Sequence, residues 1–173
     1  MKNKRKWLTG IILVLLWLFA GIYAYYSYVT QDQRVERNAA VEKARQDAKL
    51  VSVNNSWKSV WDSVYWTVEG TNADSQQVMV WIPLEPVENA PDTVKQDASV
   101  HTELLNDGMN EDQMRARIES DLPNVDIISL RPGVYDNQYV WQLMYRENDR
   151  YRYRFYRFQD GAEVGQGYTL PGK

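Results

Sequence analysis

The hydrophobic pattern begins with one long apolar segment. Residues 7–30 read WLTGIILVLLWLFAGIYAYYSYVT and carry no charge. A helix rises about 1.5 Å per residue, so this segment is long enough to span the roughly 30 Å hydrocarbon core of a bilayer. Trp7 lies at one end and tyrosines crowd the other, as in the aromatic belts at membrane interfaces. The pattern therefore predicts a transmembrane helix over residues 7–29.

The charges beside this segment predict its orientation. Residues 1–6, MKNKRK, carry four positive charges. By the positive-inside rule this tail is cytoplasmic, and the chain after Thr30 lies outside the cell. A cleaved signal peptide is the alternative, but the apolar run is longer than a usual signal-peptide core and its best cleavage site, the IYA sequence at 22–24, is poor. The sequence therefore predicts a single-pass anchor in the cell membrane.

A helical period follows the membrane segment. Residues 31–50, QDQRVERNAAVEKARQDAKL, contain no Gly or Pro, and their alanines favour helix. One apolar stripe recurs at i, i+3, i+7 and i+10: Val41, Ala44, Ala48 and Val51. Nothing between this helix and the membrane helix predicts a break.

A period of two then predicts strands. The segment VYWTVEG alternates apolar and polar side chains, and QVMVWIP does the same after the turn-forming sequence GTNADS. The second of these strands places three apolar residues on one face: Val78, Val80 and Ile82. A strand near residues 50–53 has a weaker pattern. Residues 31–84 are therefore expected to form a first domain, a helix followed by an antiparallel meander.

The pattern repeats after an acidic linker, residues 85–108, in which one strand is indicated near 98–105. Asn110 and Gln113 match a capping box, and Pro123 stops the helix that they begin. The helix carries the apolar stripe Met114, Ile118 and Leu122. Strands are predicted over 125–130, 138–145 and 150–158, with turns at Pro132-Gly133 and at Glu147-Asn148-Asp149. Residues 109–173 are expected to form a second domain of the same kind.

A short sequence echo supports the two-domain reading. The VWDS sequence at 60–63, followed by Tyr65, lies 74 positions before VYDN at 134–137, followed by Tyr139. When the sequence is shifted by the same 74 positions, the first predicted helix aligns with the second. The predicted fold class is therefore α+β: an N-terminal transmembrane helix, then two tandem small domains, each a helix packed on an antiparallel sheet.

The stretch RYRYRFYRF, residues 150–158, interleaves arginines with aromatic rings. Arginines for phosphates and rings for bases suit single-stranded nucleic acid. Beyond the basic tail, however, 16 Lys and Arg oppose 23 Asp and Glu, and a net charge of −7 outside the cell disfavours nucleic acid. As a strand, the stretch predicts rings in the core on one face and arginines on a solvated or docking face. The adjoining rings Phe155 and Tyr156 predict a bulge or the strand's end.

Residues suited to catalysis are scarce. The chain has no cysteine, which excludes thiolate metal sites and disulfides. Its single histidine, His101, falls in the acidic linker and is expected to face solvent. Asn106-Asp107-Gly108 lacks the alternating oxygen ligands and closing glutamate of a calcium loop. Asp62 and Asp136 have turn-like neighbours. No catalytic, cofactor-binding or metal-binding residue is predicted, and the protein is expected not to be an enzyme.

The order of these segments and their local sequences resemble the TseB (YpmB-like) family of Gram-positive cell-wall elongation regulators. VYWTVEGTNADSQQVMVWIP, residues 64–83, is similar to the family's first hairpin. DIISLRPGVYDNQYVWQLMYRENDRYRYRFYRFQDG, residues 126–161, is similar to its second, PepSY-like unit. The resemblance implies two cystatin-like or PepSY-like domains, no catalytic motif, and association with a class B penicillin-binding transpeptidase.

The sequence thus predicts a non-enzymatic, membrane-anchored regulator or scaffold of cell-wall elongation that binds a class B penicillin-binding protein. Five residues are predicted to contact the partner: Arg150, Arg152, Arg154, Trp57 and Trp61. An arginine face favours acidic protein surfaces or anionic wall polymers. One alternative is a PepSY-like inhibitor or modulator of an extracytoplasmic protease. Another is a hydrolase that uses the linker acids, for which no acid pair has a buried pattern.

Overall fold

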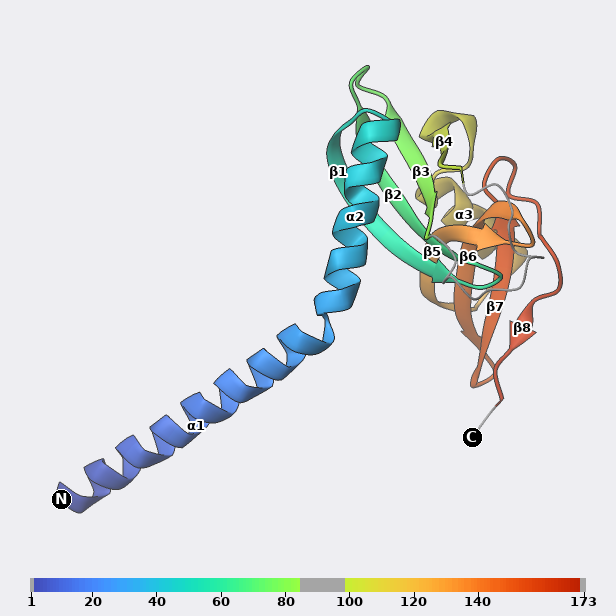
Figure 1. Ribbon diagram of the computed structural model, residues 1–173. Helices are drawn as coiled ribbons and strands as arrows, with labels where there is room; N and C mark the ends of the chain where they lie inside the picture. Colours follow the sequence, from blue (N-terminus) through green and yellow to red (C-terminus); the bar gives the residue numbers. More distant parts are fainter. Residues whose placement is uncertain (1, 85–98, 172–173) are drawn as a thin grey trace. The chain divides into compact units, whose positions relative to one another are not determined.

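The computed structural model describes residues 2–84 and 99–171, and side chains in the first helix from residue 12 onward. The chain divides into two compact units, residues 1–39 and residues 40–173. Figure 1 shows the elements in chain order: α1 (Lys2–Val29), α2 (Gln31–Asp47), β1 (Leu50–Val60), β2 (Val64–Asn72), β3 (Gln77–Pro83), β4 (His101–Leu104), the 3₁₀ helix η2 (Leu105–Asp107), α3 (Glu111–Asp121), β5 (Asp126–Tyr135), β6 (Gln138–Glu147), β7 (Arg150–Arg157) and β8 (Tyr168–Thr169).

The first unit is helical. The window Ile12–Val29 of α1 has a mean hydropathy of 1.8 and is long and apolar enough to cross a membrane. Thr30 separates α1 from α2, and its hydroxyl donates a hydrogen bond to the Tyr26 carbonyl at 2.9 Å. Such bonding back to the preceding turn competes with the helix ladder and bends helices. The expectation that nothing interrupts the helix is therefore wrong at Thr30.

The first sheet is antiparallel in the order β1-β2-β3-β4. The core between this sheet and α2 contains Val78, Val80 and Ile82, the three residues predicted to share one face of β3. This confirms that strand. The core's buried residues are Ala40, Ala44, Leu50, Trp66, Val68, Val78, Val80 and Ile82. Val51 does not join the helical stripe, because α2 ends at Asp47 and Val51 lies exposed in β1.

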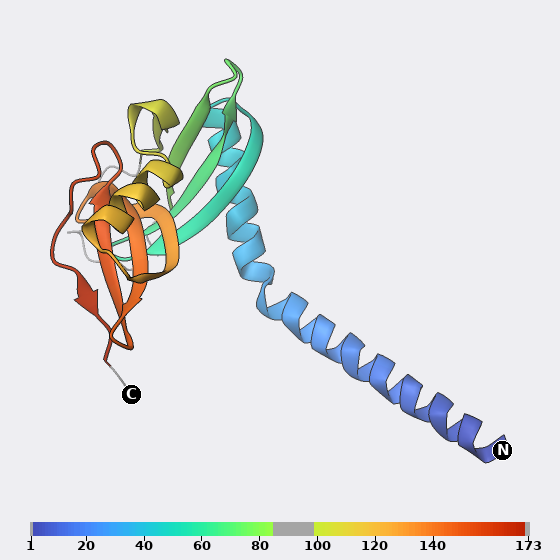
Figure 2. The ribbon, with the colours of Figure 1, turned by 180° about the vertical axis from the view of Figure 1, so that it is seen from behind.

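The second sheet is antiparallel in the order β5-β6-β7-β8, and α3 lies across one of its faces (Figure 2). Met114 and Ile118 of α3 are buried, as predicted. The predicted turn at Pro132-Gly133 is wrong, because both residues lie inside β5. The chain turns instead at Asp136-Asn137, where φ is 49° and 54°. Asp and Asn at positive φ match the type I′ hairpin turn. The sequence prediction missed this turn because the nearby Pro132-Gly133 pair is the stronger turn signal.

The two sheets share one core. Met79 and Trp81, on the side of β3 that faces away from α2, pack with Trp141 and Phe158 of the second sheet and with Met114 of α3. The strand β3 is therefore buried on both faces. Mixed α+β structure with two antiparallel sheets is confirmed. The boundaries of the two domains stay a prediction, and residues 85–98 of the predicted linker lie outside the described residues.

The capping box at the start of α3 is confirmed and supports a stability prediction. The Gln113 N–H donates to the Asn110 side chain at 2.9 Å, and the Asn110 N–H donates to the Gln113 side chain at 3.0 Å. We expect Asn110→Ala to lower the free energy of unfolding by about 1 kcal/mol, since it leaves a helix N–H without its acceptor. Urea denaturation measures this loss. Asn110→Asp, which keeps the acceptor, is the control, and an equal loss there would contradict the capping role.

Candidate functional site

The arginines of β7 do not form the solvated face that their alternation predicts. In the pairing of β6 with β7, Arg154 lies opposite Leu143 and Arg152 lies opposite Tyr145. Directly paired residues share a face of the sheet, and both partners belong to the shared core. Arg152 and Arg154 therefore lie at the margin of the α3 side, and Tyr151, Tyr153 and Phe155 lie on the opposite face. The predicted assignment of faces is wrong.

Two of the three arginines are already paired. Arg152 forms an ion pair with Glu147 at 3.0 Å, and Arg154 forms one with Glu163 at 3.2 Å. Arg154 Nε also donates to the Tyr145 hydroxyl at 3.2 Å. Burial alone would lower the pKa of Arg154, but the bond to Tyr145 and the Glu163 charge raise it. Arg150, at the β6–β7 turn, is exposed and forms no ion pair with a described residue.

The expected bulge at Phe155-Tyr156 is also wrong. β7 pairs with β6 from Arg150 to Arg157 without a register shift. Both rings are buried, on opposite faces: Tyr156 enters the shared core, and Phe155 packs with Tyr135 and Val140 beneath Trp61. The strand can keep its alternation because the first sheet covers the second face at this point.

Trp61 belongs to a junction between the two sheets. Its ring stacks on Tyr168 with centroids 5.6 Å apart and meets Tyr153 and Phe155 edge-on. Its indole N–H donates to Gln142 Oε1 at 3.0 Å. Trp57 is half-buried against the shared core. Both tryptophans are therefore committed largely to packing within the molecule.

Gln142 joins the sheets from the centre of β6. Besides accepting from Trp61, its amide donates to Ser59 Oγ at 2.6 Å, and we call this three-residue set the Gln142 clasp. A Cβ at Gly133 would lie 1.8 Å from Gln142 Nε2, so only glycine leaves room for the clasp. Nearby, the Asp136 N–H donates to the Asp62 carboxylate. These aspartates are 74 residues apart, so the equivalent turns of the sequence echo meet at this junction.

The pKa of the Tyr135 hydroxyl is raised by its contacts at this junction. The hydrogen bond with Tyr168, 3.0 Å between hydroxyls, and then burial raise the pKa of Tyr135 to about 12. In the unfolded chain, a tyrosine titrates at about pH 10. The stability that the raised pKa of Tyr135 reflects is therefore present below pH 10 and is lost as the pH rises towards 12. We expect Tyr168→Phe to return the pKa towards 10. NMR of ¹³Cζ-labelled tyrosine measures it, and an unchanged value would contradict the assigned cause.

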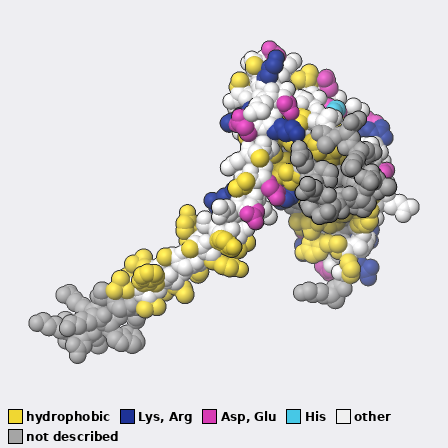
Figure 3. Space-filling model, viewed as in Figure 1, with side chains coloured by type: hydrophobic (Ala, Val, Ile, Leu, Met, Phe, Trp, Pro, Cys, Tyr) yellow, Lys and Arg dark blue, Asp and Glu magenta, His cyan; other side chains and the backbone are white. Residues whose placement is uncertain are grey.

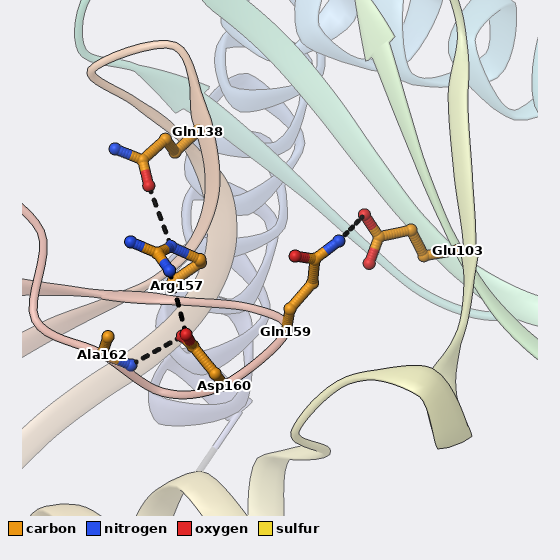
Figure 4. Close-up of polar contacts among 6 residues, drawn as sticks. All are labelled: Glu103, Gln138, Arg157, Gln159, Asp160 and Ala162. Atoms are coloured by element: carbon orange, nitrogen blue, oxygen red, sulfur yellow. Dashed lines mark hydrogen bonds and ion pairs between the residues drawn. The ribbon is translucent and has the colours of Figure 1, made fainter.

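A second contact joins the sheets at β4. His101 Nε2 lies 2.7 Å from Glu103 Oε1, and the imidazole stacks on Tyr139 with centroids 4.0 Å apart. Gln159 Nε2 donates to the same carboxylate at 3.5 Å, beside the bond network of Arg157 (Figure 4). The expectation of a solvent-facing His101 holds only in part, because Tyr139 covers one face of its ring while the side chain stays 35% exposed. Within residues 2–84 and 99–171, no group of three or more His, Cys, Asp or Glu residues is placed to hold a metal ion.

Comparison with known proteins finds one family model and one solved structure that are similar to this chain. Residues 39–83 match a family model described as a cell wall elongation regulator TseB-like domain. The YpmB protein from Bacillus subtilis has the same fold, with a TM-score of 0.63, 19% sequence identity, and coverage of 77% of this chain and 96% of that one. No curated protein matches the chain. The family resemblance seen in the sequence is confirmed.

The matched TseB-like segment contains α2 from Ala39, then β1, β2 and β3. Sequence reasoning found its tryptophans but missed what holds Trp61, because Gln142 looks like an ordinary solvated residue of an alternating strand. It also missed Tyr168, which follows a glycine-containing segment with no clear period. The VWDS and VYDN echo was the one signal that pointed to the junction.

Proposed function

We propose that this chain is a non-enzymatic regulator of cell-wall elongation that is anchored in the cell membrane, acts outside the cell and binds a class B penicillin-binding transpeptidase. The match of residues 39–83 to a TseB-like domain is the observation that carries the proposal. The apolar window of α1 supports an anchor, with the basic tail in the cytoplasm. The two helix-and-sheet parts would be cystatin-like or PepSY-like domains that serve as binding surfaces.

The proposal includes the five contact residues predicted from the sequence, and the structure supports a direct contact for some of them more than for others. Arg150 is exposed, so it can contact an acidic partner or an anionic wall polymer directly. Reversing Arg152 or Arg154 would instead place like charges beside Glu147 or Glu163. Trp61 would act through the junction that it fills. Arg150→Gln is therefore the variant that tests direct contact, because it removes the charge without placing a second carboxylate opposite Glu147, the partner of Arg152.

The first experiment crosslinks the full-length, membrane-anchored chain in cells and identifies its partners by mass spectrometry. We expect a class B penicillin-binding protein. The control chain keeps residues 1–39 and carries an unrelated domain in place of residues 40–173. Recovery of the same partner by the control would assign binding to the membrane helix. Recovery of a protease without any wall-synthesis enzyme would replace this proposal with the protease-modulator alternative.

A further inference from the structure

The C-terminal end of α1 carries four tyrosines close together. They are Tyr23, Tyr25, Tyr26 and Tyr28, and their exposed fractions run from 61% at Tyr26 to 77% at Tyr28. A helix turns about 100° per residue, so residues three apart lie on the same side of it. Tyr23 and Tyr26 therefore lie on one side of α1, and Tyr25 and Tyr28 lie on the opposite side. We call this set the tyrosine collar.

The placement of the collar on opposite sides of the helix indicates what it contacts. A helix packs on another helix along one stripe of residues three and four apart, so a single partner helix reaches only one of the two pairs. The rest of the span is uniform around the helix, since residues 7–30 carry no charge. Figure 3 shows hydrophobic side chains along the described part of α1 and charged side chains from α2 onward. A helix that is apolar on all sides is suited to a lipid environment.

The break at Thr30 limits how deep in a membrane the end of α1 can lie. The Thr30 N–H donates to the Tyr26 carbonyl at 3.0 Å, and the Arg34 N–H donates to the Thr30 carbonyl at 3.1 Å. The N–H groups of residues 31–33, between these two bonds, have no backbone acceptor among the described residues, as is usual for the first turn of a helix. Unpaired N–H groups are strongly unfavourable in hydrocarbon, where no water replaces the missing acceptor. The break is therefore expected to lie outside the hydrocarbon core.

The length of α1 agrees with a membrane boundary at the collar. The helix is continuous from Lys2 to Val29. From residue 7 to residue 25 it rises about 27 Å, close to the roughly 30 Å thickness of a hydrocarbon core. Thr30 lies about 7 Å further along, which is comparable to the thickness of one headgroup layer. The rings and the break thus indicate the same boundary through independent physical arguments.

We propose that the tyrosine collar is a lipid-binding site that fixes the depth of α1. Its rings lie at the headgroup level of the outer leaflet, where the hydroxyls donate to phosphate or ester oxygens and the ring faces contact the acyl chains. The break at Thr30 then lies at the lipid–water boundary, and the chain from Gln31 onward is outside the lipid. This inference rests on the membrane anchor in the proposed function, and it adds the residues that set where the membrane ends.

Depth measurements with spin labels on the full-length chain test the collar. The chain has no cysteine, so a single label can be placed at any chosen position in vesicles of phosphatidylethanolamine and phosphatidylglycerol. The collar labels are Tyr23→Cys, Tyr25→Cys, Tyr26→Cys and Tyr28→Cys. Leu16→Cys is the control for the hydrocarbon, and Gln33→Cys is the control for water. We expect oxygen and a water-soluble nickel chelate both to reach all four collar labels, oxygen alone to reach residue 16, and mainly the chelate to reach residue 33.

Two results of this measurement would overturn the proposal. Collar labels that behave like Leu16→Cys would place the tyrosines in the hydrocarbon. Labels on one side of the helix that neither reagent reaches would show a protein contact, such as one with a second copy of the chain, in place of lipid.

Replacing the rings tests whether they set the depth. The triple variant Tyr25→Leu, Tyr26→Leu and Tyr28→Leu should move a label at Ser27→Cys inward, by up to about one helical turn of 5.4 Å, because leucine favours the hydrocarbon. The matched control replaces the same three tyrosines with tryptophan, which keeps the preference for the interface, and should leave the label at its original depth. An unchanged depth in the leucine variant would contradict the role of the collar.

Extraction of cell membranes with alkaline carbonate separates this inference from the proposed function. Release of the full-length chain would refute the membrane anchor and the collar together. A chain that stays in the membrane but has its collar at the depth of Leu16 would overturn the collar alone. The crosslinking pull-down tests the regulator's partner independently of either result.

Discussion

Trp81→Ala is expected to lower the free energy of unfolding by about 3–5 kcal/mol, the usual range for removing a buried tryptophan side chain. The side chain is fully buried in the core that the two sheets share. Its ring lies 4.7 Å from Tyr139 and 5.1 Å from Phe158, centroid to centroid, and both belong to the other sheet. Truncation therefore leaves a cavity between the sheets that neither can close alone. Urea denaturation followed by circular dichroism measures the loss.

Two phenylalanine variants sharpen this prediction. Trp81 Nε1 is buried without a hydrogen-bond partner in the described residues, so Trp81→Phe removes no hydrogen bond and should cost under about 2 kcal/mol. Trp141 Nε1 instead donates to the Met109 carbonyl at 2.8 Å, so Trp141→Phe should cost more. Equal losses for Trp81→Ala and Trp81→Phe would show that ring volume does not dominate at this position.

The parts of the fold that sequence predicted are those specified by local chemistry. The capping box at Asn110, the stop at Pro123 and the apolar face of β3 each depend on residues a few positions apart. The alternation of β7 is also local, and it correctly separated rings from arginines. It could not say which set faces α3, because the pairing of β7 with β6 is non-local.

The junction between the sheets was beyond sequence reasoning for a similar reason. Ser59 and Gln142 are 83 residues apart, and each looks like the solvated position of an amphipathic strand. Only when the second sheet turns its Gln142 face towards Trp61 does a polar residue become a structural one. Trp61 was predicted as an exposed contact because a tryptophan beside a turn has no local signal of burial. Its actual neighbours lie far along the chain, such as Gln142, which is 81 positions away, and Tyr168, which is more than a hundred positions away.

Gln142→Ala is expected to lower the free energy of unfolding by about 2–3 kcal/mol, which is large for a polar residue that is not fully buried. Its amide satisfies both the Trp61 indole N–H and the Ser59 hydroxyl, and Ser59 is 2% exposed. Leaving a buried donor or acceptor unpaired costs about 1–3 kcal/mol. Denaturant titration measures the loss. Gln77→Ala, a solvent-exposed glutamine of β3, is the control and should stay within about 0.5 kcal/mol.

A double-mutant cycle assigns the loss to the Gln142 clasp. Ser59→Ala removes the hydroxyl, so in its presence Gln142→Ala should cost at least about 0.5 kcal/mol less than in the wild type. Additive losses would show that the two side chains are not coupled. The clasp also holds Trp61, on which Tyr168 stacks. Gln142→Ala should therefore also return the pKa of Tyr135 towards 10 even where the protein stays folded, because the ring that holds Tyr168 against the Tyr135 hydroxyl is no longer fixed.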